Sequence, residues 1–282
     1  MLTNIRSKFW SCHSFNQRIV AATEKIYKIA SYIQTLMLST CLIVLYAYFL
    51  RPLFVSNSRL PLESYIPRSE AWDAAILLSQ FYCFWLSLVV VIGYDFIYIA
   101  TSVHLVLQLR LLKQRMNSAL DQHSRATCTT EIRACIRHHQ FLYTMFLQMK
   151  EIYSAMLLYH YIVTLISTCS MSLELLLKHT DFMNYLAQSL SITFFTAQFA
   201  MYAFPAEQIA FEFSDISDAI YSSKWYRNDI RVQRILLYVM MKAQQQQYFS
   251  GVGLIDINVR AFESVVRKSF SFCAIFRNLL RS

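Results

Sequence analysis

The sequence predicts an all-α fold, a polytopic bundle of transmembrane helices with an additional helical region outside the bilayer. Three observations lead to this class. First, 56% of the 282 residues are hydrophobic and only 15% are charged, whereas soluble domains carry roughly 25% charged residues. Second, the chain has only 3 Gly and 4 Pro, so turns are few and helices are long. Third, apolar runs long enough for a membrane helix, about 20 residues, recur along the chain.

Four apolar spans are expected before residue 205. They lie at about 31–50, 74–106, 152–177 and 185–204, and together form a transmembrane bundle over residues 31–204. Arg51-Pro52 is expected to end the first span and Pro205 the fourth, because proline lacks the N–H that an interior helical position uses. The second and third helices are longer than a bilayer requires, so both are expected to continue beyond it.

Residues 205–247 are too charged to span a membrane, since positions 206–247 carry five acids and five bases. Their apolar residues nevertheless recur at helical spacing. These are Ile209, Phe213, Ile216 and Ile220, followed by Ile230, Ile235, Leu236 and Val239. We therefore expect helices here that bury an apolar stripe against protein outside the bilayer.

The last segment, 250–276, combines apolar residues with charges. It carries Arg260, Glu263, Arg267 and Lys268. Charged side chains at membrane depth usually face water or protein, which favours one wall of a pore. An interfacial helix with ion pairs between neighbouring turns fits the same residues equally well, and the residues alone leave both interpretations open.

The distribution of Lys and Arg predicts the orientation. Residues 1–30 carry five Lys/Arg and residues 107–150 carry seven, whereas the loops 51–72 and 178–181 carry three and one. Cytoplasmic loops are enriched in these residues. We therefore expect a cytoplasmic N-terminal segment (1–30), a cytoplasmic 205–247 region and an extracellular C-terminus. The C-terminal end is an exception to the rule because it carries Arg277 and Arg281.

Other classes of function find little support. The net charge of +9 lies in blocks beside apolar runs, which argues against a nucleic-acid partner. The seven Cys include no C-x-x-C pair, and His138-His139 is a single adjacent pair without the spacing of a metal-binding set. Phosphate-binding loops and nucleophile elbows are missing from the sequence as well. We expect no enzyme, no catalytic residue, no metal and no cofactor.

Four motifs then occur in order across residues 132–276. They are His139-Gln140 in "CIRHHQFLYTMF", the series Ser214, Ala219, Tyr221, Trp225 and Tyr226, the helix ending at Ala243-Gln244, and the run Lys268–Ser271. In this order they resemble the insect odorant receptor family. The resemblance implies a seven-helix receptor of the plasma membrane in olfactory sensory neurons. It also implies an odorant-gated, non-selective cation channel, assembled as a heterotetramer with a shared co-receptor subunit.

The sequence departs from the family pattern in three respects. We count about five spans where seven are expected, so we expect that the chain begins before the family's third helix and lacks the first two. The family's Gly-Gly-x-Phe reads Gly251-Val252-Gly253-Leu254 here, and its Leu-Ser-Leu-Glu-Thr-Phe reads "IDINVRAF". A truncated fragment without function therefore stays open as an alternative.

The resemblance also implies roles for particular residues. His139, Gln140, Tyr221, Trp225 and Tyr226 fall in cytoplasmic anchor helices that pack subunits together. The last helix lines the pore, and alignment on its Ser-Phe-Ser run places Ile275, and one turn later Leu279, at an apolar constriction that closes by dewetting.

The odorant pocket has no motif to carry over. The expected partners are a small volatile apolar ligand and membrane lipid. For such a ligand we expect an aromatic-lined site in the outer half of the bundle. The candidates are Tyr46, Tyr48, Phe81, Tyr82, Trp85, Phe194 and Phe195. For each of them core packing is the competing role.

Two other receptor classes fit less well. A gustatory-receptor-like chemosensory channel typically has Thr-Tyr in its last helix, where this chain has Ser271-Phe272. A G-protein-coupled receptor would carry Asp-Arg-Tyr or Asn-Pro-x-x-Tyr, which do not occur, and would show the opposite charge bias. The co-receptor itself is disfavoured because the segment 107–131 is short.

Overall fold

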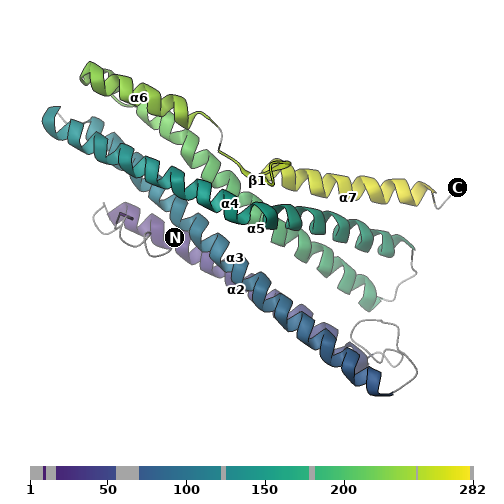
Figure 1. Ribbon diagram of the computed structural model, residues 1–282. Helices are drawn as coiled ribbons and strands as arrows, with labels where there is room; N and C mark the ends of the chain where they lie inside the picture. Colours follow the sequence, from purple (N-terminus) through teal and green to yellow (C-terminus); the bar gives the residue numbers. More distant parts are fainter. Residues whose placement is uncertain are drawn as a thin grey trace. The chain divides into compact units, whose positions relative to one another are not determined.

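The structure is a computed structural model of the chain, and it describes residues 9–10, 17–54, 70–121, 125–177, 182–245 and 247–279. Long helices dominate these residues (Figure 1). The chain divides into two compact units, one of residues 25–100 and one of residues 1–24 together with 101–282. The predicted all-α class is confirmed, with one short β-hairpin added to it.

The unit of residues 25–100 is built from most of α2 (Gln17–Phe54) and the first part of α3 (Glu70–Leu120). Contrary to expectation, α2 does not end at Arg51-Pro52 but continues to Phe54. Proline this close to a helix end removes only one backbone hydrogen bond, which the remaining turns can tolerate. Gln34 Nε2 donates to the Phe96 carbonyl at 3.3 Å and so links the two helices.

Many large apolar side chains of this unit face outward. Tyr32, Ile43 and Leu78 are each about two-thirds exposed. Water would disfavour such a surface, whereas the hydrocarbon of a bilayer would not. Three described stretches are long and apolar enough to cross a membrane: Glu24–Ile43, Gly93–Leu120 and Thr129–Leu175. The predicted division of the chain into spans and an anchor region stays a prediction.

In the second unit, α4 (Arg125–Leu177), α5 (Phe182–Ser222) and α7 (Val259–Leu279) pack along one another, and α6 (Ile230–Ala243) packs on α5 (Figure 1). One buried stripe runs along α5 with alternating spacings of three and four residues. Its members are Phe199, Tyr202, Ala206, Ile209, Phe213, Ile216 and Ile220, none more than 1% exposed. This spacing keeps the side chains on one face of a helix. The predicted burial of Ile209, Phe213, Ile216 and Ile220 is confirmed.

Pro205 does not end the fourth long helix. It lies inside α5, which continues to Ser222. A proline removes one backbone hydrogen bond and crowds the preceding turn. Ala203 and Ala206 beside it are fully buried, so packing on both sides of the proline holds the chain in one helix. The helix thus runs on beyond the expected end of the fourth span, and the end of the span at Pro205 stays a prediction.

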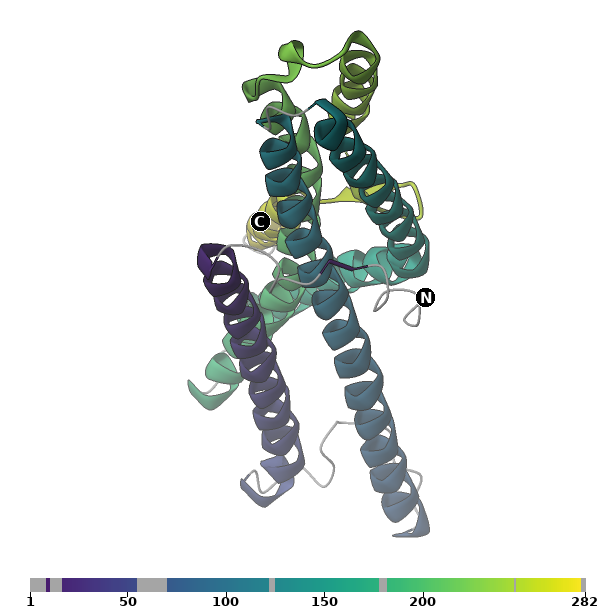
Figure 2. The same cartoon turned by 90° about the vertical axis from the view of Figure 1, so that its left-hand side faces the viewer.

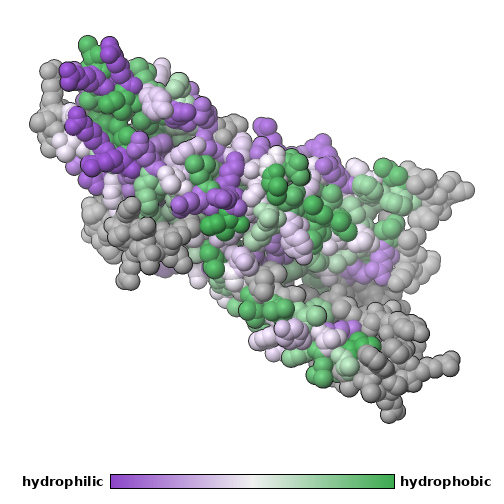
Figure 3. Space-filling view, in the orientation of Figure 1, coloured by the Kyte–Doolittle hydropathy of each residue, from purple (hydrophilic) through white to green (hydrophobic). Residues whose placement is uncertain are grey.

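The chain reverses direction after α5. A short 3-10 turn, η2 (Trp225–Arg227), leads into α6, and Figure 2 shows this connection folding back at one end of the unit. Within α6, Leu236 and Val239 are buried, but Ile230 and Ile235 are 62% and 42% exposed. Hydrophilic side chains gather around this end in Figure 3, with apolar ones between them. The α6 surface is thus only partly buried within the single chain.

Residues 249–257 form a β-hairpin, although the sequence predicted that the last helix begins near residue 250. Strands β1 (Phe249–Gly251) and β2 (Ile255–Ile257) pair antiparallel, with Phe249 opposite Ile257. Val252 and Gly253 between them have φ of 50° and 72°, and Leu254 N–H donates to the Gly251 carbonyl at 2.9 Å. Positive φ at both central positions is the geometry of a type I′ turn. Helix α7 therefore begins only at Val259.

Candidate functional site: the last helix and its support on α4

Two side chains fix the beginning of α7. Asn258 Oδ1 accepts a hydrogen bond from the Ala261 N–H at 2.8 Å, as an N-terminal cap does. Glu207 Oε2 on α5 accepts one from the Val259 N–H at 3.3 Å. A carboxylate is stabilising at a helix N-terminus, where the backbone dipoles leave partial positive charge. These contacts fix where α7 starts relative to α5.

The β-hairpin is fastened to α4 by one serine. Ser154 Oγ donates to the Ser250 carbonyl at 3.0 Å and accepts from the Val252 N–H at 2.8 Å. Gly251 lies so close to α4 that a Cβ there would be 3.1 Å from the Leu158 Cβ. A side chain at this position would force the two segments apart by a few tenths of an ångström.

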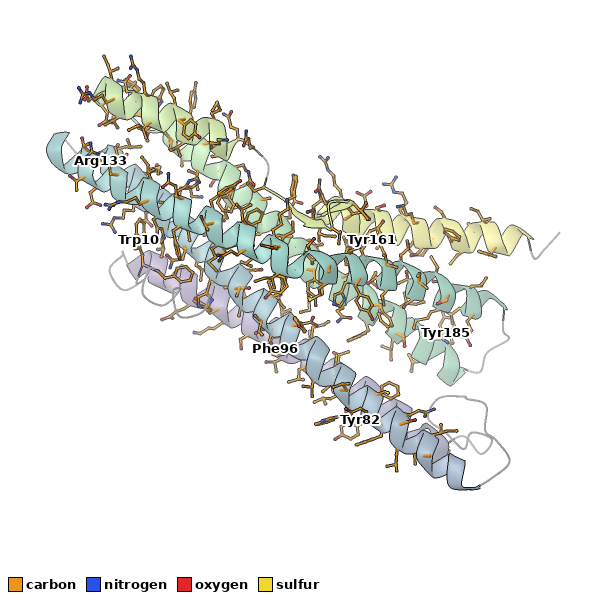
Figure 4. All side chains as sticks on the ribbon, in the orientation of Figure 1. Trp10, Tyr82, Phe96, Arg133, Tyr161 and Tyr185 are labelled. Carbon is orange, nitrogen blue, oxygen red and sulfur yellow. The ribbon has the colours of Figure 1, made fainter. Side chains whose placement is uncertain are left out.

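The inner side of α7 lies against α4. Ala261, Val265 and Ser269, spaced four residues apart, are buried. Ser269 Oγ and Thr168 Oγ1 share a hydrogen bond of 2.7 Å. Lys268 Nζ donates to the Tyr161 hydroxyl at 3.2 Å, and Figure 4 shows Tyr161 where α4 faces α7. Small hydroxyl side chains let two helices approach closely and bond across their interface.

The outer side of α7 is polar near its start and aromatic further along. Glu263 and Arg267 form an ion pair one turn apart on the exposed surface, as the interfacial-helix interpretation of this segment expects. Phe270, Phe272 and Ile275 are at least half exposed. The side chain of Leu279 lies outside the described residues, although its backbone is helical. The helix therefore has one side packed on α4 and an opposite side turned away from it.

The five predicted anchor residues lie in two places. His139 and Gln140 are on α4 and line a cavity that α5 and α6 complete. Tyr221 lies in the last turn of α5, and Trp225 and Tyr226 belong to the 3-10 turn η2. Tyr221 and Tyr226 are 75% and 59% exposed. The sequence expected all five to serve subunit packing, and that role stays a prediction.

The predicted odorant-pocket residues also fall into two groups. Tyr46, Phe81, Tyr82 and Trp85 belong to the unit of residues 25–100, and each is more than half exposed. The side chain of Tyr48 lies outside the described residues. In the other unit, Phe194 and Phe195 on α5 contact each other edge to face, with ring centres 5.7 Å apart. A shared pocket for these residues stays a prediction.

Sequence reasoning missed a charged cluster between α3 and α5. The buried Glu212 accepts from Arg110 Nε at 2.6 Å and from Gln208 Nε2 at 2.9 Å, with Lys113 Nζ 3.5 Å away. Lys113 also pairs with Asp215. Buried carboxylates need such partners. The sequence did carry a signal of this cluster, because Glu212 is an acidic residue between Phe211 and Phe213 in an otherwise apolar stretch.

A second missed feature is the docking of Trp10. Gln108 on α3 bonds both the Trp10 N–H and its carbonyl, at 3.1 Å and 3.0 Å. The indole stacks on His138 of α4 with ring centres 4.0 Å apart, and the Arg115 guanidinium lies 4.6 Å from the indole ring. Figure 4 labels Trp10 beside these helices. A lone Trp in a polar segment gave no signal of this contact.

Taken together, long helices with apolar outer surfaces, three candidate membrane spans and an amphipathic last helix define a polytopic helical membrane protein. The described residues include no cluster of three or more His, Cys, Asp or Glu placed to hold a metal ion. The family model described as 7tm Odorant receptor matches residues 7–270. The chain belongs to the odorant receptor family.

Relatives of known name agree with this assignment. The chain is 20% identical to Odorant receptor 30a of Drosophila melanogaster over 268 residues, which are 93% of this chain and 70% of that protein. It is 21% identical to Odorant receptor Or2 of Anopheles gambiae over 244 residues, 81% of this chain and 63% of that one. Across the curated relatives that it matches, the chain spans from 36% to 70% of their length.

Solved structures share the fold. The olfactory receptor OR5 of Machilis hrabei in complex with eugenol matches with a TM-score of 0.82, at 13% identity, over 94% of this chain and 70% of that one. A second structure of the same receptor matches with a TM-score of 0.81 over 93% of this chain. The helical transmembrane arrangement expected from the sequence is thereby confirmed.

Proposed function

We propose that this chain is the odorant-binding subunit of an odorant-gated, non-selective cation channel, which works with a co-receptor subunit as a heterotetramer in the plasma membrane of olfactory sensory neurons. The observation that carries the proposal is the two-sided character of α7. Ala261, Val265 and Ser269 are buried on one side, whereas Glu263 and Arg267 are exposed on another. Charged side chains facing lipid are costly. A water-filled path enclosed by α7 helices of several subunits would solvate them.

Ile275 is the residue that we propose as the gate, with Leu279 one turn further along. Ile275 is 56% exposed in the single chain, so its side chain is free to meet the same helix of neighbouring subunits. A ring of such apolar side chains closes a pore by excluding water. Ser269 and Lys268, which contact α4, lie on α7 one to two turns before Ile275. These contacts would fix α7 near the proposed constriction.

The surfaces around η2 are proposed as contacts with other subunits. Tyr221 and Tyr226 expose most of their rings. His139 and Gln140 line the cavity between α4, α5 and α6, and Trp225 lies in η2, the turn between α5 and α6. Aromatic side chains are enriched in protein interfaces. The region is proposed to lie in the cytoplasm together with the N-terminus, because the Lys/Arg-rich segments fall on that side. Epitope tags at either end, stained on intact and on permeabilised cells, test this orientation.

The proposed ligand is a small volatile apolar compound that reaches its site through or beside membrane lipid. The aromatic candidates Tyr46, Phe81, Tyr82 and Trp85, together with Phe194 and Phe195, are the first positions to vary. Eugenol, which is bound by the receptor of similar fold, is a reasonable first compound to apply.

Co-expression tests the proposal. The receptor chain and the co-receptor are produced together in oocytes, and membrane current is recorded while an odorant panel that includes eugenol is applied. We expect an odorant-evoked current carried by both sodium and potassium, and no such current from uninjected cells. Absence of current from a complex that reaches the cell surface would contradict the proposal.

A further inference from the structure

A cavity of about 310 Å³ lies between α4, α5 and α6, and its lining includes no residue of α7 and none of those proposed to bind odorant. Most of its wall is apolar, with Ile136 and Tyr143 from α4, Phe213 from α5, and Ile235 and Val239 from α6. Its volume is at the small end of the range for small-molecule sites, roughly 300–1,000 Å³. The space suits one ring or one short chain and is too small for a whole phospholipid.

The polar part of the wall combines one cation, Lys242, with His139 and the amides of Gln140, Gln245 and Gln247. Lys242, an exposed residue, lies at the edge of the cavity, and its ammonium nitrogen is 6.0 Å from the centre of the Tyr238 ring. Among the described residues Lys242 has no carboxylate partner, and no described residue of the wall is acidic. By contrast, Lys113 and Arg115 each form an ion pair. An ammonium beside an apolar space is a site where an anion gains a charge-assisted hydrogen bond.

His139 supplies a second indication. It lines the same cavity, and its Nε2 is buried without a hydrogen-bond partner in the part of the chain that the structure describes. Its ring contacts Phe213 edge to face, with ring centres 6.1 Å apart. Buried side-chain nitrogens nearly always have a partner, and a native exception calls for an explanation. An oxygen of a bound molecule would supply one after a small rotation of the ring.

We propose that this cavity binds an amphiphile with an apolar body and a single carboxylate head group, such as a medium-chain fatty acid. The apolar walls take the body, and Lys242, with His139 beside it, receives the carboxylate. A free inorganic anion would leave the apolar walls uncovered, and an uncharged odorant would gain no charge-assisted hydrogen bond from Lys242. The site goes beyond the proposed channel function, and it gives His139 and Gln140 a role other than the subunit packing proposed above.

Decanoate and decanol are the probes that test the proposal, because they share a chain and differ in charge. Binding of each is measured by calorimetry to the receptor complex in nanodiscs of neutral phosphatidylcholine. We expect Lys242→Met to weaken decanoate binding by roughly tenfold or more, which is the loss of one charged hydrogen bond, and to leave decanol binding unchanged. Lys224→Met, an exposed lysine outside the cavity, should change neither. Equal loss of both probes, or no loss of decanoate, would overturn the proposal.

A second measurement does not require any variant to fold. A decanoate that carries a photoactivatable diazirine is irradiated with the wild-type complex, and the labelled peptides are sequenced by mass spectrometry. We expect label on Tyr143 or Val239, competed by decanoate. If a short-chain lysophosphatidic acid competes with the label, the occupant of the cavity is a lipid with a phosphate head group. The proposal that the cavity binds an anionic amphiphile would still hold. Label outside the cavity would contradict the proposal, as would a cavity filled by a side chain of a neighbouring subunit.

Discussion

Thr168 of α4 and Ser269 of α7 join their side-chain oxygens in a hydrogen bond of 2.7 Å, although they are 101 residues apart in the sequence. Both residues are buried. Each hydroxyl also lies within hydrogen-bonding distance of a carbonyl oxygen of its own helix, Thr164 for Thr168 and Val265 for Ser269, so one hydroxyl donates across the interface while the other donates within its helix. The pair therefore ties the last helix to α4 at a point where both side chains are shielded from solvent.

We expect Ser269→Ala and Thr168→Val each to lower the free energy of unfolding by about 1 kcal/mol, because each removes the buried hydrogen bond between the two helices. The double variant should cost less than the sum of the two, since the partner group is then absent as well. Thermal unfolding of the purified receptor in detergent measures this. Ser271→Ala, which removes an exposed hydroxyl of the same helix, is the matched control. Strict additivity would show that the two hydroxyls do not interact.

The approach of the hairpin to α4 predicts that Gly251 tolerates no side chain. In Gly251→Ala the new Cβ would lie 3.1–3.3 Å from Cβ, Cα and N of Leu158, which include two backbone atoms that cannot rotate away. We expect a loss of about 1–3 kcal/mol, the usual cost of overpacking. Gly93→Ala is the control, because no described atom lies within 4 Å of the position that a Cβ would take there. A Gly251→Ala protein as stable as the control would contradict this close approach.

The charge cluster at Glu212 predicts an asymmetry between variants. Arg110→Met with Lys113→Met leaves the buried carboxylate with Gln208 as its one remaining described side-chain partner, and we expect a loss of about 3 kcal/mol. Glu212→Gln leaves two cations that are 42% and 26% exposed and can turn to water, so a smaller loss is expected. Arg231→Met, an exposed cation on α6, controls for the change in net charge. Equal losses would contradict the burial of Glu212.

The features that could be predicted were those with long-range periodicity. The alternating spacing of three and four residues from Ile209 to Ile220 predicts a buried stripe, and all of it is buried. The continuation of α5 through Pro205 could not be predicted, because it depends on packing by neighbouring helices. Local proline chemistry alone indicates a helix end.

The hairpin and the docking of Trp10 were missed for related reasons. Strands of three residues are too short for a period-two pattern, and Val252 is an unfavourable residue for positive φ, so the turn carried little signal. Trp10 and Gln108 are 98 residues apart, and no pattern in a single sequence pairs them. The cavity lined by His139 and Lys242 likewise depends on where α6 packs. The sequence motif that contains His139 was recognised, but the cavity that His139 lines was not predicted.

If Ile275 is part of an apolar gate, a smaller side chain should let water enter the closed pore. We expect Ile275→Ala to raise the current recorded without odorant by several-fold when the chain is expressed with the co-receptor. Phe270→Ala is the matched control, because Phe270 is 73% exposed on the same helix but lies more than one turn before Ile275. A resting current equal to that of the unaltered receptor, at equal surface expression, would remove Ile275 from the gate.

The most direct test of the account is whether the outer side of α7 faces the conducting pathway. Ser271→Cys places a thiol on the exposed side of the helix, and Val265→Cys places one on the side buried against α4. Both are made in a Cys273→Ser background and expressed with the co-receptor. A positively charged methanethiosulfonate reagent is applied during odorant-evoked current. The account predicts that the reagent reduces the current of Ser271→Cys and leaves that of Val265→Cys unchanged. An unchanged current in Ser271→Cys, with the thiol shown by labelling to have reacted, would contradict a pore lined by α7.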